Sequence, residues 1–409
     1  MSRTRRLPRI RIFILPVLTV AALTTAPAAP AVAATPAGGV AAAIASWRVV
    51  SSPNRGTGVR NDFLEATTAI SPTDAWAVGY DDATVDAHHR TLTLHWNGTA
   101  WQTVASPNPG NADLQGVAAA AGNDVWAVGV DHGPDTGVST ILIEHWNGTQ
   151  WTVVPAPTVV HDPNDSAELT AVTVISARDV WATGWAVDSS TSSILPLMLH
   201  WDGVSWRVSP PPPLPFQTYF FPRGISAASP SDVWAVGMDY TGLASQRTLA
   251  LHWNGTAWSV VPTPNPFPSF ANYFSAVKAV SATNVWAVGE GGSGGFDDFP
   301  LIARYNGTSW TTMPAPDPGR HGRLFGITAR SASDVWAVGD TRDANGLGTT
   351  RVQQWNGTGW QLAPSGNGTG SSILFGVATA SSRGFAVGVQ DAPSGQCCFR
   401  TLVLQTDAA

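Results

Sequence analysis

The chain is poor in several residue types that define other classes of protein. Its 409 residues include two cysteines, one lysine and four glutamates, and only 12% are charged. Two cysteines cannot form the disulfide framework of a small secreted domain. The formal net charge of −6 argues against a surface that binds nucleic acid or another polyanion.

The residues that are abundant favour a globular fold rich in turns. The chain has 40 glycines, 31 prolines and 19 tryptophans, and 44% of its residues are hydrophobic. Its glycine and proline content stays below the roughly 25–30% of low-complexity chains, so a substantial core is expected. Aspartate far outnumbers glutamate, which favours turns over helices.

The N-terminal segment has the composition of an export signal. Residues 1–11 contain five arginines and no acidic residue, an apolar run follows at 12–23, and small residues continue to Ala34. This order is typical of a secretory signal peptide, whereas a membrane anchor needs about 20 apolar residues. We expect a signal peptide at 1–34, a flexible linker at 35–45, and a secreted, extracellular protein without membrane attachment after signal removal.

Two phrases repeat along the rest of the chain. The first, Asp-Val-Trp-Ala-Val-Gly, recurs every 49 to 55 residues, with its tryptophan at Trp76, Trp126, Trp181, Trp234, Trp286 and Trp336 and with Phe385 in the seventh copy. The second phrase is His-Trp-Asn-Gly-Thr-x-Trp. Its first tryptophan lies 19 or 20 residues after the tryptophan of the first phrase and is replaced by Tyr305 in one copy. Repeats of this period predict an array of similar structural units.

Each repeat contains four short runs with the composition of β-strands, for example 114–120, 125–130, 140–146 and 150–154. Asn147-Gly148 joins the last two and predicts a type I′ turn, with positive φ at both residues. The aspartate of Ser/Ala-x-x-Asp, between the first two runs, is expected to bond turn amides. A repeated four-stranded antiparallel unit of about 50 residues predicts a β-propeller.

The two ends of the chain complement each other. The seventh copy ends before a fourth run, while residues 47–53 match the fourth run that starts at Trp101. We therefore predict that 47–53 form the outer strand of the last blade. The expected fold is an all-β, seven-bladed propeller over residues 46–406, closed without an exposed seam.

The order of the two phrases resembles the Val-Trp and Trp-Asp-Gly-x-x-Trp phrases of tectonin-type lectin propellers. It is also similar to secreted propellers of high-GC bacteria and, more distantly, to kelch and galactose-oxidase propellers. The resemblance covers essentially all of residues 46–406 and implies the propeller fold. Through the tectonin type it also implies a lectin-like function.

Most tryptophans and histidines fit a structural role. Eighteen of the nineteen tryptophans occupy repeat positions, which predicts packing between blades, and Trp185 is the exception. A histidine precedes the second phrase's tryptophan in only four copies, and third strands lie away from a propeller axis, so a metal ring is not expected. These positions are His95, His145, His200 and His252, with Arg304, Gln354 and Gln405 in three other copies.

The connections of variable length mark one face as the candidate binding face, because loops on a rigid frame carry function. We expect its ligand contacts to come from aromatic residues, although these could instead cap the axis. The candidates are Trp185, Phe216, Tyr219, Phe220, Phe267, Tyr273 and Phe296. Asp81, Asp82, Asp86, His88 and His89 could bind a cation, but their loose spacing leads us to predict no metal site and no cofactor.

The adjacent cysteines Cys397 and Cys398 lie in the same set of connections. In an exported chain without other cysteines they can form a vicinal disulfide, remain as thiols or pair between molecules. Export favours oxidation, so we predict the vicinal disulfide.

Three functions remain open. We favour a monomeric, non-enzymatic protein that binds an extracellular glycan or cell-surface polymer. A polysaccharide hydrolase or lyase is the alternative, for which Glu65, Glu144, Glu168 and Glu290 lie in different blades. A carboxyl group with a raised pKa beside an ionised one would favour the enzyme. A protein-interaction scaffold would instead present a broad apolar face.

Overall fold

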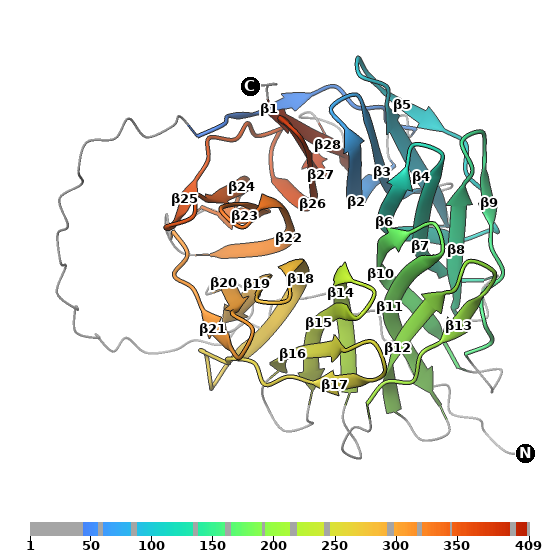
Figure 1. Ribbon diagram of the computed structural model, residues 1–409. Helices are drawn as coiled ribbons and strands as arrows, with labels where there is room; N and C mark the ends of the chain where they lie inside the picture. Colours follow the sequence, from blue (N-terminus) through green and yellow to red (C-terminus); the bar gives the residue numbers. More distant parts are fainter. Residues whose placement is uncertain are drawn as a thin grey trace, which may run out of the picture.

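The computed structural model describes residues 44–55, 60–82, 88–133, 138–159, 165–189, 193–212, 219–240, 246–292, 298–316, 321–343, 346–392 and 398–406. In these residues, 28 strands form seven four-stranded antiparallel sheets arranged as blades around an axis (Figure 1). Within the same ranges, no helix is long and apolar enough to cross a membrane. The chain is a seven-bladed β-propeller, as the repeats predict.

The strands occupy four equivalent places in each blade. The innermost strands contact one another around the axis and are β2 (Asp62–Ser71), β6 (Ala112–Ala121), β10 (Ala167–Ser176), β14 (Tyr219–Ser229), β18 (Ala271–Ser281), β22 (Gly322–Ser331) and β26 (Ser372–Ala380). The second strands are β3 (Asp74–Asp82), β7 (Asp124–Asp131), β11 (Asp179–Asp188), β15 (Asp232–Tyr240), β19 (Asn284–Gly292), β23 (Asp334–Arg342) and β27 (Arg383–Asp391).

The outer half of each blade is built in the same way. The third strands are β4 (His89–Trp96), β8 (Thr140–Trp146), β12 (Ser193–Trp201), β16 (Gln246–Trp253), β20 (Asp298–Tyr305), β24 (Gly348–Trp355) and β28 (Phe399–Thr406). The outermost strands are β5 (Trp101–Val104), β9 (Trp151–Val153), β13 (Trp206–Val208), β17 (Trp258–Val260), β21 (Trp310–Thr312), β25 (Trp360–Leu362) and β1 (Trp47–Val50). We number the blades 1 to 7 from β2–β5 to β26–β28.

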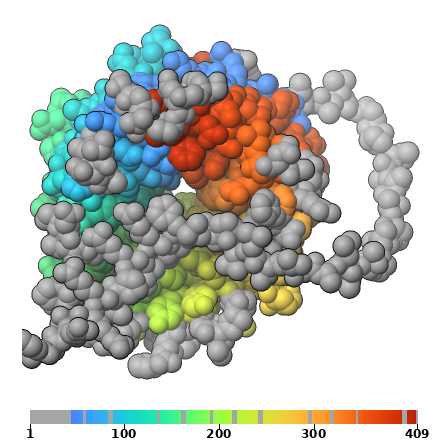
Figure 2. All heavy atoms as spheres, turned by 180° about the vertical axis from the view of Figure 1, so that it is seen from behind, coloured from blue at the N-terminus to red at the C-terminus, as the bar shows by residue number. Residues whose placement is uncertain are grey.

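The N-terminal strand closes the ring. β1 pairs with β28 in blade 7, with Trp47 opposite Thr406, which confirms that the N-terminal segment completes the last blade, although the strand covers Trp47–Val50 rather than the predicted 47–53. The backbone N–H of Trp47 also donates to the carbonyl of Pro364 at 2.8 Å and ties the strand to blade 6. Seen from behind, blade 1 in blue and blade 7 in red lie side by side (Figure 2).

The repeated tryptophans pack between blades, as predicted. Trp76 of blade 1 is buried and contacts Trp146 and Trp151 of blade 2, with ring centroids 4.9 and 5.3 Å apart. The same arrangement joins blades 2 and 3 through Trp126, Trp201 and Trp206. Because each tryptophan is shared by two blades, the ring is held by a series of nearly equivalent apolar interfaces.

The second hairpin of blades 1 to 6 differs from the predicted type I′ turn. In blade 1, Gly98 has a φ of +96°, but Asn97 is not among the residues with positive φ. The Asn97 side-chain oxygen instead accepts hydrogen bonds from the backbone N–H groups of Thr99 and Ala100, at 3.0 Å each. The turn spans four residues, and the asparagine stabilises it through its side chain.

The histidines before the second phrase form a second repeated contact. His145 Nε2 lies 2.8 Å from Asp124 Oδ1, and the ring lies against Trp126 with centroids 4.3 Å apart. We call the four such pairs the His–Asp clasps: His95–Asp74, His145–Asp124, His200–Asp179 and His252–Asp232. The structural interpretation of the histidines is therefore confirmed.

The same clasps correct the prediction for the aspartates. Each aspartate holds the third strand of its own blade and leaves the turn to another residue. In blade 1 the turn amide of Thr73 donates to Ser71 Oγ, at 3.1 Å. Ser176, Ser229 and Ser331 accept the equivalent bond in their blades. In these four blades the serine of Ser/Ala-x-x-Asp thus stabilises the turn.

The strand pairing places the variable connections at one end of the propeller. Asp62 at the start of β2 is opposite Asp81 near the end of β3, and Asp82 is opposite His89 at the start of β4. We call this end the variable end. The other, the repeat end, carries the stereotyped turns and the His–Asp clasps.

Candidate functional site

A ring of side chains near the axis forms the candidate site at the variable end. It comprises one residue from each innermost strand and the residue opposite it on the second strand. This mouth ring consists of Phe63 and Tyr80, Asp113 and Val130, Glu168 and Trp185, Phe221 and Met238, Tyr273 and Glu290, Arg323 and Asp340, and Ile373 and Val389.

A β-bulge and a glycine fix this position in every blade. In blade 1 the bulge lies between Leu64 and Ala66 of β2. A Cβ on Gly79 would lie 2.1 Å from the carbonyl oxygen of Phe63, so only glycine allows the second strand to approach so closely. The last glycine of the first phrase thus sets the geometry of the mouth ring. Because bulges re-aim side chains, the bulged Glu65 joins the same region.

Aromatic rings lead from blade 7 across blade 1. Phe63 stacks on Tyr80 with centroids 4.8 Å apart, and Tyr80 stacks on His89 at 4.3 Å. Phe399 of β28 contacts Phe63 from the other side at 5.4 Å. This part of the mouth ring is therefore an aromatic surface that ends at a histidine.

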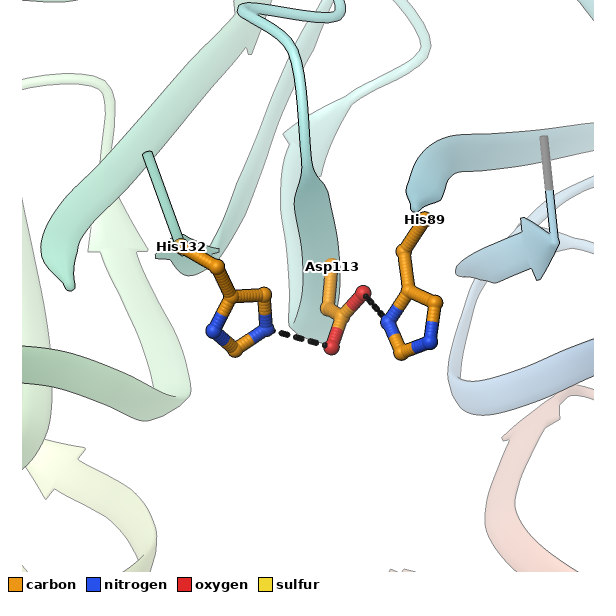
Figure 3. A group of neighbouring side chains, drawn as sticks. All are labelled: His89, Asp113 and His132. Atoms are coloured by element: carbon orange, nitrogen blue, oxygen red, sulfur yellow. Dashed lines mark hydrogen bonds and ion pairs between the residues drawn. The ribbon is translucent and has the colours of Figure 1, made fainter. Parts of the chain in front are cut away.

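Asp113 connects that surface to blade 2. Its carboxyl group lies between two imidazole rings (Figure 3), 2.6 Å from His89 Nδ1 and 3.0 Å from His132 Nε2. Burial opposes ionisation of Asp113, but the hydrogen bonds from His132 and His89 outweigh it and lower the pKa of Asp113. The hydrogen bond to Asp113 raises the pKa of His132. This part of the ring therefore holds an ionised carboxylate between two imidazoles.

Two glutamates near Asp113 have raised pKa values, in contrast to the lowered pKa of Asp113. Burial, together with the charge of Asp113, raises the pKa of Glu65 to about 7. Burial also raises the pKa of Glu168 to about 7, although a hydrogen bond from the Trp185 indole and the charge of His132 lower it in part. Near neutral pH these carboxyl groups can donate as well as accept hydrogen bonds.

The opposite side of the ring is organised around Glu290. The Tyr273 hydroxyl donates to Glu290, and the Arg223 guanidinium lies 5.1 Å from the Tyr273 ring centroid. Burial raises the pKa of Glu290 to about 7, while the Tyr273 hydrogen bond and the Arg323 charge lower it in part. Arg323 also donates to both oxygens of Asp340, at 2.9 and 2.7 Å. This bidentate pair fixes the guanidinium beside the site.

Several residues predicted from the sequence belong to this region. Trp185 and Tyr273 lie in the mouth ring, and Trp185 contacts Phe221 with centroids 6.0 Å apart. Tyr219 starts β14 and lies near Tyr240, with centroids 6.3 Å apart. Their role as ligand contacts stays a prediction.

Other predicted residues lie elsewhere or outside the described residues. Phe220 is 4% exposed and packs in the core between blades 3 and 4, which leaves little surface for a ligand. Phe267 stacks on Phe299 at 5.7 Å. Phe216, Phe296 and Cys397 lie outside the described residues, so the vicinal disulfide stays a prediction. Cys398 has a φ of +99°.

Sequence reasoning missed Phe63, Tyr80, Asp113 and the role of Glu65 in the site. Their signal is positional: the residue after the first phrase is Tyr80, Val130, Trp185, Met238, Glu290, Asp340 and Val389 in the seven copies. The phrase before it is nearly constant. Trp185 thus occupies a repeat position at which the residue type differs in almost every blade.

A groove of about 790 Å³ lies at the repeat end, between blades 2 and 3. Its lining includes Trp126, His145 and Trp201, which have equivalents in most other blades. The groove is separate from the carboxyl groups with raised pKa values. We assign it to the repeated scaffold for this reason.

Comparisons with known proteins support the fold alone. No family model matches the chain, and no curated protein matches its sequence. Among solved structures, one described as YCF48 bound to D1 peptide is 14% identical, with a TM-score of 0.50, covering 89% of this chain and 97% of that chain. A protein of unknown function from Dyadobacter fermentans is 12% identical, with a TM-score of 0.49, covering 85% and 97%. YjhT is 10% identical, with a TM-score of 0.43, covering 79% and 98%. At these identities the chain shares with YCF48 the propeller fold.

Proposed function

We propose that this chain is a secreted, non-enzymatic binding protein that recognises a glycan or other cell-surface polymer at the mouth ring. The observation that carries the proposal is the pairing of aromatic side chains with carboxyl groups. Trp185 lies opposite Glu168 on the paired strand, and Tyr273 donates to Glu290. Aromatic faces suit the C–H surfaces of sugars, and carboxyl groups suit their hydroxyls, because a binding site combines apolar walls with a few placed polar groups.

The arrangement of the fold supports binding at this end. The repeat end presents the same clasps and turns in blade after blade, whereas the mouth ring presents a different pair of side chains in each blade. A rigid frame with one varied end is how many proteins carry a recognition site. The tectonin-like order of the two phrases is consistent with a sugar ligand.

A hydrolase is the second candidate, and one observation favours it. Glu65 has a pKa raised to about 7, while the neighbouring Asp113 has a lowered pKa. A protonated carboxyl group beside an ionised one is the acid and base pattern of glycosidases. In this candidate, Glu65 would be the acid and Asp113 the base or nucleophile.

One experiment separates these functions. The purified chain is incubated with insoluble and soluble polysaccharides and cell walls, and retention and released sugar ends are measured in the same tubes. Retention without product, lost in Trp185→Ala, supports the binding protein. Product that disappears in Glu65→Gln supports the hydrolase. If neither signal appears, the search turns to protein partners, and the peptide-bound state of YCF48 makes peptides the first class to test.

Matched variants control for folding. Trp185→Phe keeps an aromatic face but loses the indole N–H, so it should retain part of the binding if stacking dominates. Leu362→Ala changes an exposed apolar residue on the outermost strand of blade 6 and should leave binding unchanged. Equal losses in Trp185→Ala and Leu362→Ala would overturn the assignment to the mouth ring.

A further inference from the structure

The cluster in Figure 3 combines three side chains from two blades. His89 starts β4 of blade 1, Asp113 is the second residue of β6, and His132 follows the end of β7. One ligand atom from each lies within 4.8 Å of the other two. We propose that His89, Asp113 and His132 bind a divalent transition-metal ion of the zinc type.

The donor set determines the class of ion. Two imidazole nitrogens and one carboxylate oxygen suit zinc and its neighbours, whereas calcium and magnesium require sites built from oxygen ligands. Zinc binds nitrogen and oxygen donors at about 2.0–2.2 Å, so its ligands lie roughly 3.4 Å apart in a tetrahedral site. The Asp113 oxygens lie 2.6 and 3.0 Å from the two imidazole nitrogens, and all three ligand atoms lie within 4.8 Å of one another. Shifts of about 1 Å, with Asp113 moving outward and the imidazoles adjusting, would bring the three ligands to this spacing.

The backbone holds the two histidines in place independently of Asp113. The backbone N–H of His89 donates to the Asn111 side-chain oxygen at 2.9 Å, and that of His132 donates to the Asn111 carbonyl oxygen at 2.7 Å. Asn111 precedes Asp113 by two residues on the same segment. One short stretch of blade 2 therefore carries the carboxylate and fixes both imidazole-bearing segments around it.

The ring nitrogens that face away from Asp113 have polar neighbours. His132 Nδ1 lies 3.4 Å from Ser139 Oγ, and His89 Nε2 lies 3.7 Å from Asp82 Oδ1. Such outer contacts orient the imidazoles of metal sites and select the nitrogen that binds. The His89, Asp113 and His132 side chains are 27%, 12% and 34% exposed, so an ion can enter and retain a solvent ligand.

Comparison with the His–Asp clasps isolates what is special about this cluster. Each clasp joins one histidine to one aspartate at 2.8–2.9 Å, with a tryptophan against the ring. Only the cluster at the variable end adds a second histidine, and it is the sole group of three potential ligands found in the described part of the chain. The clasps are therefore matched controls with the same residue types.

The proposal does not depend on glycan binding and is tested with Zn²⁺ alone. The full chain is stripped with a chelator and titrated by calorimetry, and the bound metal is counted after dialysis. We expect one equivalent per chain. Asp113→Asn and His132→Gln should each weaken binding by at least about tenfold, because each removes a direct ligand. His200→Gln, in a clasp, should leave binding unchanged.

A spectroscopic measurement on the unaltered chain keeps the test independent of variant folding. X-ray absorption of the zinc-loaded protein should show two imidazoles and oxygen ligands around the ion. Absence of stoichiometric binding, a spectrum with fewer than two imidazoles, or full binding by both Asp113→Asn and His132→Gln would each overturn the proposal.

Discussion

At the repeat end, four blades each have a histidine paired with an aspartate at equivalent positions. At the mouth ring, no two blades have the same pair of residue types opposite each other. Both ends are built on the same strands, so the difference does not come from the backbone. At the repeat end, similar side chains serve the similar interfaces between neighbouring blades. The side chains of the mouth ring do not have to meet this packing requirement. Variation restricted to one end of a repeat protein is therefore a guide to function.

The surroundings of buried glutamates also differ between the mouth ring and the repeated core. Buried glutamates at the mouth ring have neighbours of opposite charge or hydrogen-bond donors, such as Arg323 for Glu290 and Trp185 for Glu168. Glu144 lies in the repeated core of blade 2, where Leu94, Leu199 and Leu251 occupy the equivalent positions of other blades. It is fully buried, and neither carboxyl oxygen has a hydrogen-bond partner among the described residues. Glu144 is thus a point where the core departs from its own repeat with an ionisable group, and blade 6 has Gln353 at this position.

The largest effect is expected from Glu144→Leu, which restores the repeat. Burial raises the pKa of Glu144 to about 8 from its ordinary value of 4.5. The folded protein then holds a proton that the unfolded chain releases, so the stability falls as the pH rises from about 4.5 to 8. The substitution should stabilise the protein by about 4 kcal/mol above pH 8 and much less at pH 4.5.

Chemical denaturation of both proteins at several pH values measures this effect. Glu144→Gln is the control, because it removes the titration but keeps a buried polar group. It should abolish the pH-dependent part of the difference and leave the protein less stable than Glu144→Leu. A gain that is the same at pH 4.5 and pH 9 would contradict the assigned pKa.

The next effect compares a His–Asp clasp with the corresponding contact in blade 6, which has no histidine. Asp179 Oδ1 accepts from His200 Nε2 at 2.9 Å and from the buried Trp181 indole at 3.0 Å. Asp179→Ala should cost about 2 kcal/mol, because it leaves a buried donor without an acceptor. In blade 6, Asp334 accepts from Gln354 and Arg330 instead, and Asp334→Ala should cost about 1 kcal/mol.

Thermal denaturation of both variants ranks the two blades. Asp179→Asn keeps an acceptor oxygen and should recover much of the stability lost in Asp179→Ala. Equal losses in Asp179→Ala and Asp334→Ala would contradict the larger cost assigned to the clasp.

A smaller, local effect is expected in the mouth ring. Arg323 lies 3.8 Å from Glu290, and its charge partly offsets the burial that raises the pKa of Glu290 to about 7. Arg323→Met should therefore raise the pKa of Glu290 further. The chain contains four glutamates, so carbon NMR of glutamate-labelled protein gives four titrations, which Glu→Gln variants assign. The midpoint of Glu65 should stay unchanged, and a fall in the Glu290 midpoint would refute the assigned role of Arg323.

The sequence predicts the frame more completely than the site for a physical reason. Each blade repeats the same local packing, so Trp76 and its copies reveal the period of the repeat. The match of Trp47 to Trp101 reveals how the ring closes. The site forms where unlike residues of different blades meet. Nothing in the sequence distinguishes Asp113 from the many other aspartates. It lies between His89 and His132 because the start of β6 is placed beside the start of β4 and the end of β7.

The smallest effect is expected where the repeat varies without changing its contacts. Blade 3 has Asp202 where blade 1 has Asn97, and its side chain accepts from the backbone N–H groups of Val204 and Ser205, at 2.9 Å each. The bonds from Ser205 and Val204 lower the pKa of Asp202. This contribution is present above the unfolded pKa and is lost as the pH falls through the lower folded value. Asp202→Asn should leave the denaturation midpoint at pH 7 nearly unchanged and flatten the acid limb slightly, because asparagine accepts the same two bonds without titrating. A clear loss of stability at pH 7 would show that the charge itself, through Arg207 at 3.0 Å, contributes to this turn.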